Sequence, residues 1–184
     1  MKKMTKLIAV GFTAAAIFLG TNVKAQTIGT GVRLGIGVEG LLPTGNLHDV
    51  SNVGVGITPR LQFGVADNLG LTLTSGYLNY FGKELGNTGV KTKSYGMVPV
   101  KAGIKAFVSQ NIYLSGEVGA AFETSGFGEV KGGPEYDTNT KLLASPGIGW
   151  ANQTWDVGVR YENYSGQSNN FGAVGLRIAY GFAL

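Results

Sequence analysis

The segment VKAGIKAFVSQNIYLSGEVGAAFE, residues 100–123, alternates between apolar and polar or small side chains on both sides of a short Ser-Gln-Asn turn. Before the turn, Lys101 and Lys105 interrupt an apolar series, and after it Glu117 and Glu123 do the same. A period of two residues is that of a β-strand whose two faces meet different surroundings. The segment therefore predicts an antiparallel hairpin with one apolar and one charged face.

The same period recurs through the rest of the chain, and no stretch beyond the N-terminal region has sustained helical periodicity. We therefore expect an all-β domain. The alternation predicts eight strands, at 32–39, about 54–65, 69–81, 95–108, 112–124, 141–151, 155–164 and 171–184.

The connections between these strands alternate in length. Three are short, at 66–68, 109–111 and 152–154, and four are longer, at about 43–53, 82–94, 125–141 and 165–170. Short turns at one end and long loops at the other, with an even number of strands, are typical of a transmembrane up-and-down β-barrel. The last strand, FGAVGLRIAYGFAL (171–184), is then expected to pair with the first and remove the open edges of the sheet.

The N-terminal residues have the pattern of a cleavable signal peptide. Lys2, Lys3 and Lys6 precede an apolar run at 7–19, and small residues lie three and one positions before a cut after Ala25. We expect residues 1–25 to be removed and 26–184 to form one barrel domain. The alternative of a membrane anchor is less favoured, because a spanning helix needs about 20 apolar residues.

The charge balance argues against a nucleic-acid partner. The leader holds four of the 15 basic residues and no acid, so 11 basic residues remain against 11 acidic ones. A nucleic-acid interface needs a surviving basic surplus or stripe. We expect no nucleic-acid binding.

All charged residues in the predicted strands fall on one face. A basic side chain facing lipid at mid-membrane costs about 2–4 kcal/mol, so this face is expected to line the lumen, where acids and bases offset one another. Within this network we expect Arg177 to pair with Glu39 or Glu162. The predicted lumen charges are Arg33, Glu39, Arg60, Lys101, Lys105, Glu117, Glu123, Asp156, Arg160, Glu162 and Arg177.

The apolar face carries aromatic residues near both strand ends. Two aromatic rings around an aliphatic belt are the interfacial girdles of a membrane barrel, and they favour this class over a secreted soluble ligand-binding barrel. The residues are Phe63, Trp150, Trp155, Tyr180 and Phe182 toward the short turns, and Tyr77, Phe122 and Tyr161 toward the long loops.

Three prolines lie inside predicted strands, although a proline cannot donate to a sheet ladder. We interpret Pro59, Pro99 and Pro146 as β-bulge positions.

Candidate catalytic residues are few. The chain has no cysteine and one histidine, His48, beside Asp49 and Ser51. A lipid-modifying hydrolase could use such groups, but catalytic triads normally collect their members from separated elements, so we expect no enzyme activity. No metal-ligand spacing or cofactor motif is present, and we expect neither a metal nor a cofactor.

The chain resembles the small outer-membrane β-barrel proteins of Gram-negative bacteria, the OmpA-like and OmpX-like "porin family". The resemblance is carried by residues 100–123, LLASPGIGWANQTWDVGVRYE (142–162) and GLRIAYGFAL (175–184). It implies an outer-membrane location, eight antiparallel strands in contact with outer-membrane lipid, and a last strand read by the barrel assembly machinery. Family members commonly end on an aromatic residue, whereas this chain ends on Leu184 with Phe182 two residues earlier.

The function expected from these features is non-enzymatic. An eight-stranded barrel is just wide enough for its own side chains, so we expect a lumen closed by ion pairs and a structural or recognition role for the long loops. Loop 125–141 is the first candidate for an extracellular ligand, because recognition tends to lie on loops held by a rigid scaffold. A narrow pore for small polar solutes is the alternative, since lumen-side glycines could leave space.

Overall fold

The computed structural model describes residues 31–84, 91–134, 136–166 and 170–184. The predicted signal peptide lies outside these ranges. The strands are β1 (Val32–Gly45), β2 (Ser51–Ala66), β3 (Leu69–Ser75), β4 (Tyr77–Gly82), β5 (Tyr95–Phe107), β6 (Ile112–Glu123), β7 (Thr140–Ala151), β8 (Trp155–Ser165) and β9 (Phe171–Ala183). Between β1 and β2 lies a five-residue helix, α2 (Asn46–Val50).

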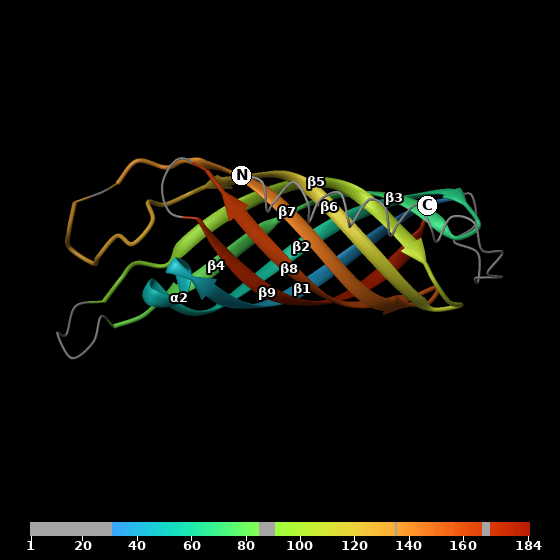
Figure 1. The fold of residues 1–184 in the computed structure, drawn as a ribbon, viewed down its shortest axis with the longest axis horizontal. Helices are drawn as coiled ribbons and strands as arrows, with labels where there is room; N and C mark the ends of the chain where they lie inside the picture. The colour runs from blue at the N-terminus through green and yellow to red at the C-terminus, as the bar shows by residue number, and fades with distance from the viewer. Residues whose placement is uncertain (1–30, 85–90, 135, 167–169) are drawn as a thin grey trace, which may run out of the picture.

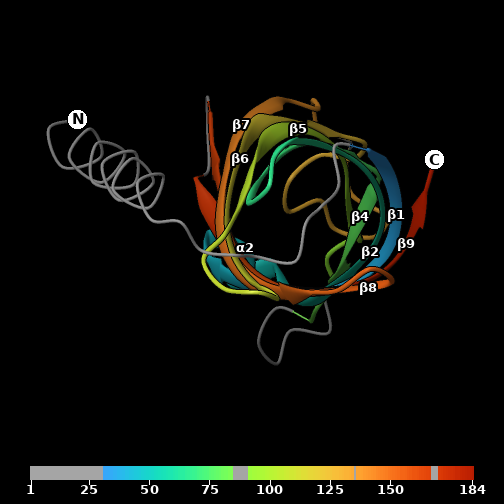
Figure 2. The same ribbon diagram turned by 90° about the vertical axis from the view of Figure 1, so that its right-hand side faces the viewer.

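The strands form one closed antiparallel barrel (Figures 1 and 2). β3 and β4 each pair with β2 on one side and β5 on the other, every other strand pairs with its neighbours along the chain, and β9 pairs with β1 from Arg33↔Ala183 to Gly45↔Phe171. This confirms the predicted closure by the last strand. The barrel wall has eight strand positions, which we call staves, because β3 and β4 follow one another in a single position beside β2.

The two ends of the barrel differ, as the connection lengths predict. The long connections and α2 gather at one end, at the left of Figure 1, and the short turns lie at the other. We call these the long-loop end and the short-turn end. Within the described residues, no helix is long and apolar enough to span a bilayer.

The stave 69–81 is interrupted at Gly76, which the sequence analysis did not predict. Gly76 has φ 152°, a backbone conformation that side chains with a Cβ rarely adopt, and a Cβ there would collide with the carbonyl oxygen of Ile57. Glycine is therefore required at this break.

The interpretation of the three prolines as bulges is wrong. Each keeps its register on one edge, in the pairs Ile36↔Pro59, Pro99↔Ala121 and Gly116↔Pro146. On the opposite edge the ladder skips the proline and resumes without a register shift. A proline has no N–H, so it leaves one edge unbonded without inserting an extra residue. The gaps beside Pro59 and Pro99 flank Gly76 from either side.

The outer surface of the barrel is apolar. Large hydrophobic side chains along every stave are exposed, such as Val38 at 59%, Val118 at 64% and Leu142 at 65%. No charged side chain in any of the strands described is exposed. An exposed apolar surface of this extent needs a nonaqueous environment, which a bilayer supplies.

The eight predicted girdle aromatics all lie on this outer surface, exposed between 39% and 48%. Near the short-turn end, Trp155 packs edge-on against Tyr180 with ring centroids 5.4 Å apart, and Tyr180 contacts Phe182 at 4.9 Å. The contact joins β8 to β9.

Candidate functional site: the filled lumen

The lumen is where the charged residues converge. Nine of the eleven predicted lumen charges form one connected set of ion pairs, contributed by β1, β2, β5, β6, β8 and β9. The other two lie apart from it. Glu123 pairs with Lys141 at 3.6 Å, and Arg33 donates to the backbone carbonyls of Asn152 and Gln153 in a short turn.

Glu162 lies at the long-loop end of the network and is fully buried. Its Oε1 accepts from Lys101 Nζ and from Arg160 Nε, each at 2.8 Å, and its Oε2 accepts from the Tyr164 hydroxyl. A buried carboxylate is tolerated only when such partners satisfy it.

Glu39 and Glu117 form the next level toward the short turns. Glu39 accepts from Thr58 Oγ1 at 2.5 Å and from Arg160 Nη2. Glu117 accepts from Thr74 Oγ1 at 2.6 Å and from Arg60 Nη2 at 3.0 Å. The hydroxyl donors Thr58 and Thr74 were not among the predicted site residues, although they share the polar face of β2 and β3.

Arg177 connects Glu39 to Asp156, which lies nearer the short turns. It faces Glu39 directly across the β1–β9 pair, with Nε 3.7 Å from Oε1, and its Nη1 lies 3.7 Å from Asp156 Oδ2. Of the two partners expected for Arg177, the structure gives it Glu39. The ion pairs of Glu162 are with Lys101 and Arg160 instead.

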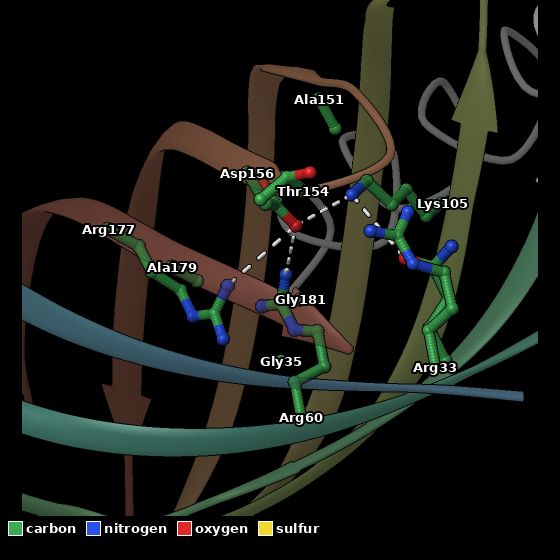
Figure 3. Close-up of a pocket in the computed structure, with 11 residues that line it drawn as sticks. Arg33, Gly35, Arg60, Lys105, Ala151, Thr154, Asp156, Arg177, Ala179 and Gly181 are labelled. Atoms are coloured by element: carbon green, nitrogen blue, oxygen red, sulfur yellow. Dashed lines mark hydrogen bonds and ion pairs between the residues drawn. The ribbon is translucent and has the colours of Figure 1, made fainter. Parts of the chain in front are cut away.

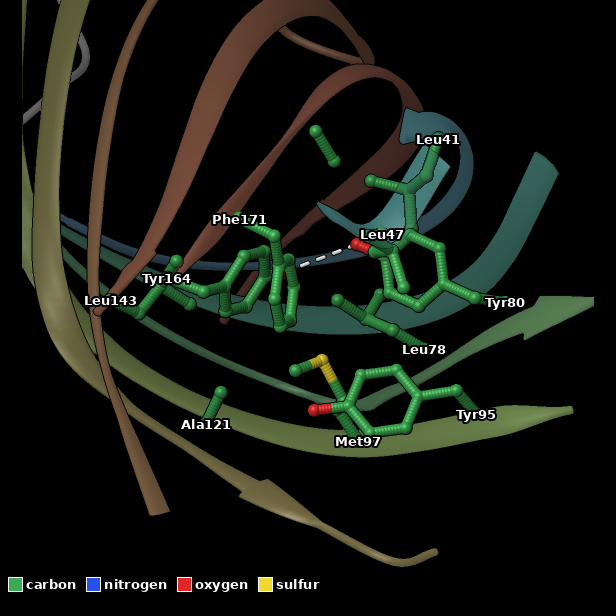
Figure 4. Packing of buried hydrophobic residues seen from close by; sticks show 11 residues of the cluster. Leu41, Leu47, Leu78, Tyr80, Tyr95, Met97, Ala121, Leu143, Tyr164 and Phe171 are labelled. Carbon is green, nitrogen blue, oxygen red and sulfur yellow. Dashed lines mark hydrogen bonds between the residues drawn. The ribbon is translucent and has the colours of Figure 1, made fainter. Parts of the chain in front are cut away.

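The lumen changes character toward the long-loop end, where it is apolar and aromatic (Figure 4). We call this cluster the apolar cap. The prediction of a lumen closed by ion pairs is therefore wrong for this end, where apolar side chains fill the lumen. The cap consists of Leu41, Leu47, Leu78, Tyr80, Tyr95, Met97, Ala121, Leu143, Tyr164, Phe171 and Ala173.

Aromatic stacking holds the cap together across the lumen. The rings of Tyr164 and Phe171 stack with centroids 4.8 Å apart, and Tyr95 meets Phe171 edge-on at 5.8 Å. Phe127, from the connection between β6 and β7, stacks on Phe171 at 5.5 Å. A long loop therefore closes over the cap from above.

One tyrosine hydroxyl connects the cap to the charge network, because Tyr164 donates to Glu162. Tyr95 donates to Glu123 Oε1 at 2.5 Å, and Glu123 lies level with the cap residue Met97. Buried tyrosines pack with their rings and still need a hydrogen-bond partner for the hydroxyl. The cap and the charge network are thus one continuous filling of the lumen.

The lumen-side glycines that could have left a polar path are covered by long side chains. A Cβ at Gly37 would lie 2.7 Å from Cζ of Arg177, and one at Gly149 would collide with the Tyr113 hydroxyl. The glycines therefore make room for the arginine and tyrosine side chains.

Three of the four long connections are tied to one another by hydrogen bonds. Lys93 N donates to Glu129 O at 2.6 Å, and Lys131 N donates to Lys91 O at 3.0 Å, which joins residues 91 and 93 to the loop after β6. Thr92 Oγ1 donates to Val50 O at 2.7 Å and so ties α2 to both. We call this joined set the loop platform.

Glu129 organises the candidate recognition loop 125–141 from within. Its Oε1 accepts from the backbone N–H groups of Gly126 and Tyr136, each at 3.0 Å, and its Oε2 pairs with Lys93 Nζ at 3.0 Å. The hydrogen bond from the Tyr136 amide, followed by that from Lys93, lowers the pKa of this carboxyl. Tyr136 itself directs an exposed side chain outward.

The His48, Asp49 and Ser51 side chains do not assemble into a catalytic arrangement. His48 and Asp49 are exposed, whereas Ser51 is buried and donates to Phe81 O at 2.7 Å. In the described part of the chain no hydrogen bond joins the three side chains. Nor do the described residues contain a group of three or more His, Asp or Glu that could hold a metal ion.

Comparison with known proteins places the fold. No family model matches the chain, and no curated protein matches it. Among solved structures, Ail, the attachment invasion locus protein of Yersinia pestis, superposes with a TM-score of 0.60 at 16% identity, over 84% of this chain and 100% of that one.

Two further structures agree. OprG from Pseudomonas aeruginosa gives a TM-score of 0.52 at 10% identity over 89% of this chain and 100% of its own. The N-terminal barrel of OprF from Pseudomonas aeruginosa gives 0.50 at 13% identity over 82% and 97%. This chain therefore has the fold of the eight-stranded outer-membrane β-barrels.

Proposed function

We propose that the protein is a non-enzymatic integral outer-membrane barrel with a closed lumen, and that it acts as a scaffold for the loop platform. The observation that carries this proposal is that two sets of side chains block the lumen, the ion-pair network toward the short turns and the apolar cap toward the long loops. The apolar outer surface supports the membrane location.

The alternative functions of the sequence analysis have less support. A pore for polar solutes would need a hydrated path past Tyr164 and Phe171, whose stacked rings are almost completely buried. A hydrolase at His48 would need Ser51 to face the histidine, and its hydroxyl is bonded to Phe81 instead. A soluble barrel would need a charged exterior.

Membrane integration is tested by fractionation. The protein is expected to stay with outer-membrane fractions through high-salt and alkaline washes, and to migrate differently on gels before and after heating. Release by the washes would contradict the location. This location also requires delivery to the barrel assembly machinery, which we propose reads β9.

The closed lumen is tested by liposome swelling. Proteoliposomes carrying the protein are placed in isosmotic glycine or small sugars, and we expect them to swell no faster than empty liposomes. Swelling that scales with the amount of protein would replace the closed barrel by a pore.

Recognition is proposed for the loop platform because it combines an exposed aromatic residue with a braced backbone. Tyr136 is 53% exposed, and its own amide is fixed by Glu129. Tyrosine is enriched at binding surfaces because its ring supplies area and its hydroxyl supplies a hydrogen bond.

The recognition role is tested on arrays of glycans and extracellular proteins, using the barrel in nanodiscs. Binding is expected to fall at least tenfold in Tyr136→Ala and to persist in Tyr180→Ala, a matched change on the lipid face. Absence of binding by the wild-type protein, or equal loss in both variants, would contradict it.

A further inference from the structure

The short-turn end of the lumen contains a small cavity of about 30 Å³ (Figure 3). Its walls come from β1, β2, β5, β7, β8 and β9 and from the turn residue Thr154. A space of this size holds about one or two water-sized species.

The side chains around the cavity carry a surplus of positive charge. Four cations, Arg33, Arg60, Lys105 and Arg177, line it together with one carboxylate, Asp156. Counted over the described lumen as a whole, seven cationic side chains face five carboxylates. The excess is concentrated at this end.

Asp156 is already committed to several partners. Its Oδ2 lies 2.7 Å from Lys105 Nζ, 3.7 Å from Arg177 Nη1 and 3.8 Å from Arg60 Nη1. Its Oδ1 accepts from the Tyr113 hydroxyl at 2.6 Å. Dashed lines in Figure 3 show the three cations converging on this carboxylate. Asp156 is the one acid among the lining residues, and of its three cations Arg60 and Arg177 also pair with Glu117 and Glu39, respectively.

Arg33 adds a fourth cation at the rim. Its guanidinium donates to the carbonyls of Asn152 and Gln153, and in the described part of the chain it lies within ion-pair distance of no carboxylate. The two backbone carbonyls accept only part of its five N–H groups and do not neutralise its charge.

A second, independent feature is an unpartnered donor in the cavity wall. Gln62 is only 6% exposed, and its Nε2 has no hydrogen-bond partner, whereas its Oε1 lies 3.5 Å from Lys105 Nζ. A buried donor without an acceptor destabilises the folded state, because the donor has lost its hydrogen bonds to water. An acceptor bound in the cavity would give Gln62 Nε2 the hydrogen-bond partner that it lacks.

We propose that the cavity binds one small monovalent anion of the halide class, with Gln62, Lys105 and Arg33 as its donors. A water molecule would satisfy the Gln62 amide but would leave the charge surplus in place. A cation is disfavoured by the four basic groups. The anion would complete the lumen network at the end opposite the apolar cap.

The direct test is a crystal of the full barrel soaked in bromide, which is chemically close to chloride and gives an anomalous signal. We expect a bromine peak inside the cavity, within hydrogen-bond distance of Gln62 Nε2. A cavity that contains only water, with no anomalous peak, would overturn the proposal. This readout needs no variant and is independent of whether the lumen conducts.

A solution test uses stability at constant ionic strength. Replacing gluconate, which is too large for the cavity, with chloride is expected to raise the urea midpoint steadily, because a ligand that binds only the folded state stabilises it. A wild-type midpoint that does not respond to chloride would contradict the proposal.

The matched variants are Gln62→Glu and Gln110→Glu. The first places a carboxylate in the cavity as a built-in anion and is expected to weaken bromide and chloride binding at least tenfold. Gln110 lies exposed in a short turn, and its variant is expected to respond to chloride as the wild type does. An unchanged chloride response in folded Gln62→Glu would overturn the assignment of Gln62.

Discussion

The short-turn part and the long-loop part of the lumen are both filled by side chains, but by side chains of different chemistry. Below, inward-facing charges such as Glu162 and Lys101 form ion pairs, and above, inward-facing rings such as Tyr164 and Phe171 stack on one another. Both sets occupy the same face of the sheet. A side chain that faces the lumen of this barrel is therefore not necessarily polar.

The two parts differ in how they tolerate change. A buried ion pair depends on both partners, since removing one leaves an uncompensated charge. An apolar cluster loses contacts in proportion to the atoms removed, and its neighbours partly relax into the space. We therefore expect the charge network to respond more strongly to single substitutions than the cap.

The largest effect is expected for Glu162→Leu. The change leaves Lys101 and Arg160 without their shared acceptor and should lower the free energy of unfolding by about 3–5 kcal/mol. Urea unfolding in detergent micelles, followed by the fluorescence of Trp150 and Trp155, measures it. Glu84→Leu on the exposed loop is the control, with an expected change within about 0.5 kcal/mol. Equal effects of the two variants would contradict the network.

A smaller effect is expected for Phe171→Ala in the cap. Phe171 contacts Tyr164, Tyr95 and Phe127, and its truncation should cost about 3 kcal/mol in the same assay. Phe122→Ala makes the same chemical change on the lipid face, where detergent or lipid chains fill the space. If Phe122→Ala costs as much as Phe171→Ala, the cap is not a packed cluster.

A still smaller effect is expected from removing a hydroxyl group inside the charge network. Thr74→Val keeps the side-chain shape but removes the donor to Glu117 and the acceptor for Arg60 Nε, which should cost about 1.5–3 kcal/mol. Thr138→Val, on an exposed loop position, should have little effect. A neutral Thr74→Val would mean that the ion pairs need no hydroxyl support.

The smallest effect is expected outside the barrel, at Glu129. Because hydrogen bonds lower the pKa of this carboxyl in the folded loop, its contribution is full above the ordinary carboxyl range and is lost as the pH falls below that range. Glu129→Gln should speed hydrogen exchange at the Gly126 and Tyr136 amides at neutral pH and remove its acid dependence. Asp137→Asn, on the same loop, is the control. Unchanged exchange in Glu129→Gln would contradict the bracing of the loop.

Much of the barrel could be predicted from the sequence because strand alternation and charge position are local signals. The short turns, the pairing of the last strand with the first and the inward face of each stave all follow from a period of two residues. The break at Gly76 and the behaviour of the prolines depend on the neighbouring strands. No single strand reveals them.

The apolar cap was harder to predict because hydrophobicity alone points outward in a membrane barrel. Tyr164 lies two residues after Glu162 and Phe171 six before Arg177, so their position in the alternation assigns them to the lumen despite their apolar character. Their even spacing from charged residues of the same strand is the sequence signal that could have predicted that Tyr164 and Phe171 face the lumen. The contact of Phe127 with the cap joins residues distant in the chain, and only the tertiary structure reveals it.

The closed lumen is tested most directly by single-channel recording of the wild-type protein in a planar lipid bilayer. With the cap stacked above the ion-pair network, we predict no steady current above the bilayer background across a range of voltages. Reproducible steady conductance steps from the purified protein would show a continuous aqueous path and would contradict a closed lumen.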